Sequence, residues 1–265
     1  MPVETQDLIV RGLAGGLLGL VVGSFLTVVI TRVPDGASLW PRSACPNCGG
    51  RVGAKDNIPV LSWLVLRGRC RSCKEPISPL YPVVEASTAV LFTLVAMFAS
   101  PLAAVPAYLY AAAVAVALTA IDARTRRLPD AIVLPSFPVL AALLALASWL
   151  TADWSALLRA GIGGLGLLVA YGLIHLIKPN GMGKGDVKLA GLIGLILAYQ
   201  GWGPLAVGVF GAFLLGSVWG IGVIAKSRGG RKTTIPFGPW MCAGAVLGCA
   251  VGGPLWDLYR QMMQV

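Results

Sequence analysis

Long apolar runs, separated by short polar loops, follow one another along nearly the whole chain. Crossing a hydrocarbon core of roughly 30 Å takes about 20 residues of α-helix, and runs of this kind recur throughout the sequence. We interpret eight of them as transmembrane helices, at residues 8–30, 83–99, 105–121, 131–150, 157–177, 187–199, 205–225 and 237–256, the sixth being the shortest. The pattern therefore predicts an all-α polytopic membrane bundle of about eight spans.

The segment between the first two apolar runs is the one sizeable polar part of the sequence. The chain thus divides into a first transmembrane helix at residues 1–30, a small domain at residues 31–82, and a bundle of seven further spans at residues 83–265. A domain of roughly fifty residues buries too little apolar surface to be stable by itself. We expect a metal ion or the membrane surface to help hold it.

Composition and charge support a membrane protein with a defined orientation. Hydrophobic residues make up 57% of the chain and charged residues only 12%. Of the 21 lysines and arginines, 18 fall in the loops that follow the odd-numbered spans. Because positively charged loops stay in the cytoplasm, we expect these loops, and the small domain with them, inside and both termini outside. The net charge of +10 is then explained by the orientation of the protein in the membrane and does not indicate nucleic-acid binding.

Two Cys-x-x-Cys pairs lie in the small domain, Cys45 with Cys48 and Cys70 with Cys73. Each pair can supply two thiolates from one tight turn, which is typical of a tetrahedral zinc site in a zinc-ribbon-like domain. Two disulfides or a redox pair are the alternatives, although structural disulfides are rare on the reducing cytoplasmic side. Since four thiolates close the coordination sphere, the zinc is expected to be structural.

Three aspartates stand at the ends of apolar runs: Asp122, Asp130 and Asp186. Asp130 and Asp186 each precede an apolar run, so either could be an N-cap, and for Asp130 this interpretation is favoured. Asp186 also closes a Gly-x-Gly-x-Gly stretch, which lets the backbone pass close to a substrate or a second helix. Asp122 ends a run, where the helix dipole disfavours an anion, so capping does not explain it. Pairing with Arg124, Arg126 or Arg127 is the remaining structural explanation.

Carboxylates at membrane depth are costly and tend to mark functional sites. Two of them brought together can share a proton, so that one activates water while the other polarises a peptide carbonyl. The aspartates at the ends of these apolar runs are therefore compatible with aspartic-protease chemistry. The single histidine, His175, is more simply explained as a packed or interface residue than as a catalytic base.

Ordered motifs along the chain carry a resemblance to a known family. They are residues 23–34 (GSFLTVVITRVP), both Cys-x-x-Cys pairs, residues 57–64 (NIPVLSWL), 66–70 (LRGRC), 81–85 (YPVVE), 121–130 and 181–186 (GMGKGD). In these motifs the sequence resembles the bacterial type IV prepilin peptidases, bifunctional leader peptidases and N-methyltransferases of type IV pilus and type II secretion systems. The resemblance covers almost the entire chain.

The resemblance implies an enzyme of the bacterial inner membrane with Asp122 and Asp186 as its catalytic pair. It implies cleavage of a short basic leader after a glycine in a prepilin or pseudopilin, at the cytoplasmic membrane edge. Methylation of the new N-terminus with S-adenosylmethionine would follow, and Gly68 and Arg69 match positions associated with that step, while the role of Glu85 is open. The alternatives are a peptidase without methyltransferase activity, a transporter in which both aspartates bind cations or protons, and a scaffold whose zinc domain docks partners.

Overall fold

The computed structural model describes residues 3–40, 43–179, 181–226 and 236–263. The described residues form helices and loops without a named β-strand, and the chain divides into two compact units, Met1–Ala120 and Ile121–Val265. Among the described helices, seven are long and apolar enough to cross a membrane. The sixth predicted span, at residues 187–199, corresponds to a shorter helix in the second unit, so the expected all-α membrane bundle is confirmed.

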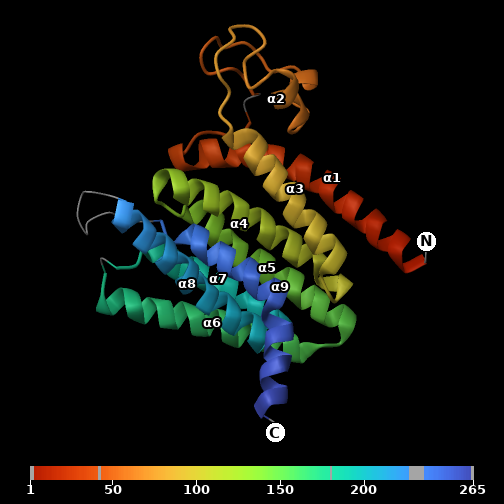
Figure 1. The fold of residues 1–265 in the computed structure, drawn as a ribbon, viewed down its shortest axis with the longest axis vertical. Helices are drawn as coiled ribbons and strands as arrows, with labels where there is room; N and C mark the ends of the chain where they lie inside the picture. Colours follow the sequence, from red (N-terminus) through yellow and green to blue (C-terminus); the bar gives the residue numbers. More distant parts are fainter. Residues whose placement is uncertain (1–2, 41–42, 180, 227–235, 264–265) are drawn as a thin grey trace. The chain divides into compact units, whose positions relative to one another are not determined.

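Two long helices, α1 (Val3–Arg32) and α3 (Leu80–Phe98), pack side by side in the first unit (Figure 1). Glycines on α1 face α3 at very short range, since a Cβ added to Gly19 would lie 2.6 Å from Cα of Ala89. Small residues of this kind let two transmembrane backbones approach closely, because lipid provides no hydrophobic force to drive the helices together. The first unit also contains the greater part of α4 (Val105–Thr125) and a 3₁₀ turn, η3 (Leu102–Ala104).

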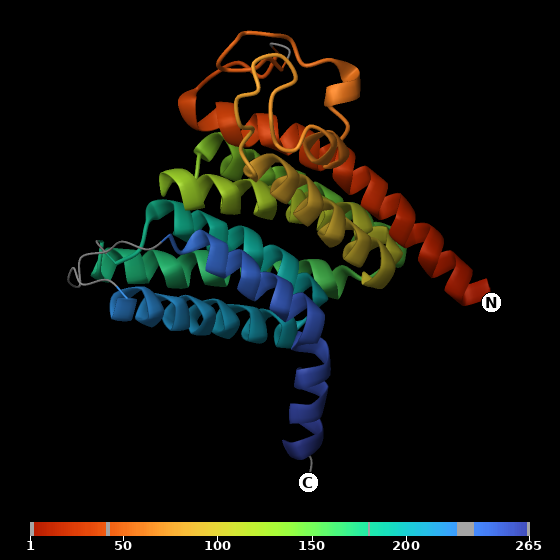
Figure 2. The same cartoon turned by 45° about the horizontal axis from the view of Figure 1, so that its top comes forward.

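The segment that joins α1 to α3 is rich in loops and holds the four cysteines. Figure 2 shows it as a lobe between the end of α1 and the start of α3. Its regular elements are short: the 3₁₀ turns η1 (Val33–Asp35) and η2 (Ala54–Asp56), and the helix α2 (Leu61–Val65).

Five helices complete the second unit: α5 (Asp130–Thr151), α6 (Trp154–Ile177), α7 (Lys184–Gln200), α8 (Trp202–Lys226) and α9 (Gly238–Met263). The helices α6 and α7 are close neighbours, as are α8 and α9. The helix α7 contacts each of the four others, and most of its residues from Leu189 to Tyr199 are buried. At 17 residues it is short for a membrane span, but protein rather than lipid surrounds it.

The C-terminal end of α7 is held by a side chain from α6. Arg159 donates from Nε to the carbonyl oxygen of Ala198, at 2.7 Å, and from Nη2 to that of Tyr199, at 2.8 Å. These carbonyls belong to the last turn of α7, which has no further helical N–H groups to bind them. A single residue, Gly201, then connects α7 to α8. This half-buried arginine thus fixes the central helix from the end opposite to Asp186.

Candidate functional site

Asp122 is a buried carboxylate, with only 5% of the residue exposed, in the last turn of α4. Its Oδ2 accepts a hydrogen bond from the backbone N–H of Gly238, with 3.1 Å between the two atoms. Gly238 is the first residue of α9, where backbone N–H groups are free to bind an anion. Among the described residues no ion pair includes Asp122, so the arginine pairing considered from the sequence is not found.

Asp186 lies in the first turn of α7, three residues after the N-cap Gly183. Its Oδ2 accepts a hydrogen bond from the backbone N–H of Gly183, at 3.1 Å. The sequence suggested Asp186 as an N-cap, and this is wrong, because Gly183 occupies the N-cap position and Asp186, as the third helical residue, accepts from its N–H. The glycines of this stretch also permit a close contact, because a Cβ at Gly185 would lie 2.8 Å from Cβ of Leu128.

The carboxylates of Asp122 and Asp186 lie near enough to interact electrostatically. Both residues belong to the second unit, although 64 positions separate them in the sequence (186 − 122). The two aspartates are also held alike, each through Oδ2 by the backbone N–H of a glycine at the start of a helix. The second unit thus brings together the two carboxylates that the sequence singled out.

Asp130 does not act as the helix cap that its sequence position suggested. Pro129 occupies the N-cap of α5, without a side-chain cap, and Asp130 is the first residue of the helix. The Asp130 carboxylate instead forms an ion pair with Lys188 of α7, with 2.6 Å between Oδ1 and Nζ. The favoured interpretation was wrong because the ammonium group that binds this carboxylate comes from a helix distant in the sequence.

His175 lies near the C-terminal end of α6, and its ring contacts the loop before α7. Its Nδ1 is 2.7 Å from the carbonyl oxygen of Met182. This contact connects α6 to the glycine-rich stretch that precedes Asp186. The structure thus places His175 at an interface between two elements, in agreement with the interpretation from the sequence.

The four cysteines of the small domain converge. The Sγ atoms of Cys45, Cys48, Cys70 and Cys73 lie within 4.8 Å of one another, and those of Cys45 and Cys73 are 3.7 Å apart. Zinc–sulfur bonds of about 2.3 Å in a tetrahedron place sulfur atoms about 3.8 Å apart, so the donor set fits a metal ion. Backbone hydrogen bonds from Cys48 and Asn47 lower the pKa of the Cys45 thiol to about 7. The cluster could therefore bind a metal ion.

Both pairs of cysteines sit in turns of the same design. The N–H of Gly49 donates to the carbonyl of Cys45, and the N–H of Lys74 donates to that of Cys70. Gly49 and Lys74 both have positive φ, at 67° and 62°. A left-handed residue four positions after the first cysteine closes each turn, and this shared geometry directs both pairs of thiols toward one point.

Gly68 and Arg69 lie just before the second pair of cysteines. Gly68 has a φ of 66°, and a Cβ there would lie 2.8 Å from the indole of Trp63, so this position requires glycine. Arg69 lines a cleft of about 590 Å³ together with Val65, Leu66, Arg67, Cys70 and Lys74. Gly68 is thus part of the turn that forms a cationic cleft beside the cysteine cluster.

Glu85, whose role the sequence left open, is a buried carboxylate in the first unit, 7% exposed. Its Oε2 accepts a hydrogen bond from the backbone N–H of Val60, at 2.7 Å, and it also interacts with the side chain of Ser24 in α1. Val60 has a φ of 61°, a strained conformation for a β-branched residue. Glu85 therefore anchors the start of α2 to the pair of long helices.

Gly238 is the site residue that the sequence interpretation missed. A Cβ at this position would lie 2.8 Å from Oδ2 of Asp122, so the close approach depends on the absence of a side chain. The available signal was its place between Phe237 and Pro239, at the start of the last apolar run. No pattern in the sequence around this glycine indicated a contact with Asp122.

Comparisons with known proteins agree with the motifs and their order. Residues 17–99 match the bacterial peptidase A24 N-terminal domain, and residues 109–221 match the type IV leader peptidase family. No solved structure matches the chain.

Three relatives illustrate the similarity, each called a prepilin leader peptidase/N-methyltransferase. One from Aeromonas hydrophila is 37% identical over 266 residues, covering 85% of this chain and 85% of the relative. One from Burkholderia pseudomallei (strain 1026b) is 37% identical, and the match covers 91% of this chain and 86% of the relative. One from Pseudomonas putida is 33% identical, and the match covers 94% of this chain and 92% of the relative. With relatives this similar over most of both chains, this multi-pass membrane protein belongs to the type IV leader peptidase family.

Proposed function

We propose that the protein is an aspartic endopeptidase that removes the basic leader of a type IV prepilin or pseudopilin, with Asp122 and Asp186 as the catalytic pair. The observation that carries this proposal is that these two carboxylates of the second unit are each held through Oδ2 by the N–H of a glycine at the start of a helix, and lie near enough to interact electrostatically. It rests also on membership of a family whose relatives are called prepilin leader peptidases.

The geometry suits a mechanism in which the two carboxylates share a proton. One aspartate, ionised, takes a proton from water as that water attacks the peptide carbonyl, while the other, protonated, donates a hydrogen bond to the carbonyl oxygen. Glycine N–H groups hold Oδ2 of both side chains, and no hydrogen bond to Oδ1 is found for either within the described part of the chain. In this proposal the Oδ1 atoms are the ones that act on water and substrate.

The proposal includes a cytoplasmic active site in the bacterial inner membrane and cleavage after a glycine. The charge of the loops supports this orientation, since 18 of the 21 lysines and arginines fall on the side that carries Asp122 and Asp186. The scissile bond would then lie where the hydrophobic helix of a prepilin leaves the membrane.

Purified protein incubated with a prepilin tests this proposal. We expect Asp122→Asn and Asp186→Asn each to abolish cleavage, while Asp130→Asn, the matched control, cleaves as the wild type does. Methylation of a synthetic pilin peptide that already begins at the mature N-terminus would show that the inactive variants are folded. Complete processing by either variant would refute the assignment, and a transporter would yield no shortened product at all.

We further propose that the protein methylates the new N-terminus and that the cleft at Arg69 holds S-adenosylmethionine. This cofactor would supply an electrophilic methyl group to the amine exposed by cleavage. Within the cleft, Arg69 and Arg67 offer cations for the carboxylate of the cofactor, and Val65 and Leu66 offer apolar surface. The name N-methyltransferase in the relatives supports this second activity.

Labelled S-adenosylmethionine and a mature pilin peptide test this assignment without any cleavage step. Arg69→Gln is expected to lower methyl transfer strongly, whereas Arg51→Gln, which changes an exposed arginine beside the first pair of cysteines, should not. Equal loss in both variants would show that the effect is one of general charge and not of the cleft.

The cysteine cluster, we propose, binds one structural zinc ion. The four thiolates would close the coordination sphere, so the metal would brace the domain and take no part in cleavage. Elemental analysis is expected to find about one zinc per chain, and none after Cys70 and Cys73 are both changed to Ser. Reduced protein, prepared without chelators, that contains no zinc would refute this.

A further inference from the structure

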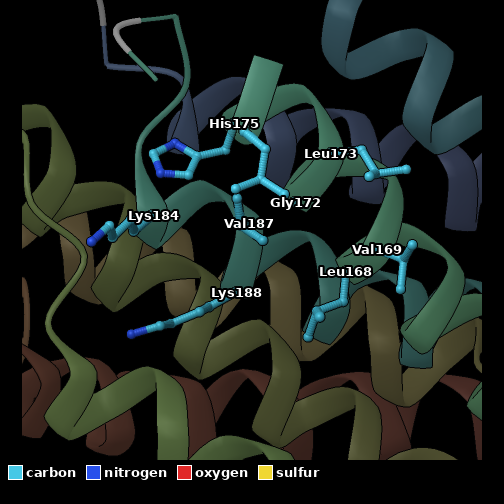
Figure 3. A pocket seen from close by; sticks show the side chains of 9 residues that line it. Leu168, Val169, Gly172, Leu173, His175, Lys184, Val187 and Lys188 are labelled. Carbon is cyan, nitrogen blue, oxygen red and sulfur yellow. The ribbon is translucent and has the colours of Figure 1, made fainter. Parts of the chain in front are cut away.

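A groove runs between α6 and α7 and has one apolar end and one cationic end (Figure 3). Its volume is about 640 Å³. On α6 the aliphatic side chains of Leu168, Val169 and Leu173 line it, and the last two are 49% and 54% exposed. His175, near the end of α6, and Lys184 and Lys188, in the first two turns of α7, line the other end.

The groove is open at Gly172 of α6, which has no side chain. A Cβ there would meet only Cγ1 of Val187, at the ordinary contact distance of 3.8 Å, so the space above Val187 is open. Figure 3 shows Gly172 and Val187 next to each other, between the aliphatic residues and the cationic ones. A larger residue at position 172 would fill this space with its own side chain.

The two lysines at the cationic end differ in whether they form an ion pair. Lys188 is already paired with Asp130. No ion pair among the described residues includes Lys184, which is exposed. In Figure 3 the ammonium groups of both lysines extend to the same side, away from Leu173 and Val169. Among the described residues, the groove therefore presents at this end a lysine that is not held in an ion pair.

We propose that this groove binds one phospholipid with an anionic headgroup, with the phosphate at Lys184 and an acyl chain along Leu168 and Leu173. The order of the lining residues matches such a lipid, because a headgroup belongs at the membrane edge and an acyl chain in the hydrocarbon. The hydrophobic helix of a substrate is the rival occupant. Its basic leader would meet Lys184 and Lys188 with like charge, which disfavours it.

The bound lipid would lie beside the catalytic turn, because Lys184 is two residues before Asp186 on α7. On the other side of the groove, His175 contacts the carbonyl of Met182, in the loop that leads into that turn. A headgroup at Lys184 would therefore hold the first turn of α7 from the lipid side. This inference concerns binding and does not depend on the proposed peptidase activity.

Native mass spectrometry of the purified protein tests the proposal, with phosphatidylglycerol and phosphatidylcholine of the same acyl chains as probes. We expect the wild type to retain one phosphatidylglycerol at concentrations where phosphatidylcholine is not retained. Lys184→Gln should weaken this binding about fivefold, as expected for one cation near a lipid headgroup. Lys178→Gln removes an exposed cation at the end of α6 that does not line the groove, and it should leave binding unchanged.

A second pair of variants tests the apolar end. Gly172→Leu fills the groove and should remove the retained lipid, whereas Gly166→Leu, on the same helix but facing open space, should not. Equal retention of both lipids, or full binding by Gly172→Leu, would overturn the proposal. Competition by glycerol phosphate alone would indicate a site for soluble anions. If a prepilin peptide displaces the lipid and Gly172→Leu alone raises its KM, the groove belongs to the substrate and the proposal is wrong.

Discussion

The carboxylate of Asp122, at the end of α4, accepts a hydrogen bond from the backbone N–H of Gly238, the first residue of α9. The two residues are 116 positions apart in the chain. A helix C-terminus disfavours an anion and a helix N-terminus favours one. The start of α9 therefore supplies the stabilisation of negative charge that the end of α4 cannot give. The orientation of a proposed catalytic side chain thus depends on a glycine of the last helix.

Changing Gly238 to Ala should therefore reduce cleavage of a prepilin. The new Cβ would lie 2.8 Å from Oδ2 of Asp122 and would displace the carboxylate. We expect kcat to fall about a hundredfold, the effect of misplacing a reacting group by about 1 Å, with KM little changed. Gly253→Ala on the same helix faces open space and serves as the control. A wild-type kcat in Gly238→Ala would show that this contact does not position Asp122.

Asp130 should be dispensable for cleavage and contribute little to stability. Its ion pair with Lys188 is partly exposed, and such pairs are worth about 0–1 kcal/mol. A double-mutant cycle with Asp130→Asn and Lys188→Met, followed by thermal unfolding, measures the interaction. A coupling energy well above about 1 kcal/mol would mean that water screens this pair less than its exposure indicates.

Glu85 should hold the start of α2 through a hydrogen bond that glutamine can replace and alanine cannot. Glu85→Ala leaves the N–H of Val60 without its acceptor, at a cost of about 1–3 kcal/mol, and we expect faster amide exchange around α2. Glu85→Gln keeps an acceptor oxygen and should be closer to wild type. Hydrogen–deuterium exchange of residues 57–66 checks both variants, and equal protection in all three proteins would contradict this role.

Arg159 should matter for the stability of the second unit, since it binds two carbonyls in the last turn of α7. Hydrogen bonds to a charged group contribute about 1.5–3 kcal/mol, so Arg159→Met is expected to lower the unfolding temperature clearly. Arg11→Met removes a partly exposed arginine that pairs with Asp7 within α1, and its effect should be small. Similar unfolding temperatures for the two variants would argue against a capping role.

Hydropathy and spacing determined the helical architecture and most of the proposed site. The apolar runs alone placed eight helices, seven of them long and apolar enough to cross a membrane, because a span must be long and apolar whatever its neighbours are. The two Cys-x-x-Cys pairs indicated a metal site, since each supplies two ligands from one local turn. Asp122 and Asp186 were recognisable because carboxylates at the ends of apolar runs are rare and costly.

The tertiary structure decided which groups meet. It paired Asp122 with Gly238 and Asp130 with Lys188, and it placed the short α7 among four other helices. Transmembrane helices share an apolar composition, and lipid is as apolar as their surfaces, so hydropathy does not reveal which of them pack together. Those contacts follow from the fit of small residues and from single polar bonds between distant segments. For this reason the two aspartates could be identified from the sequence, whereas the role of Gly238 in orienting Asp122 was visible only in the folded structure.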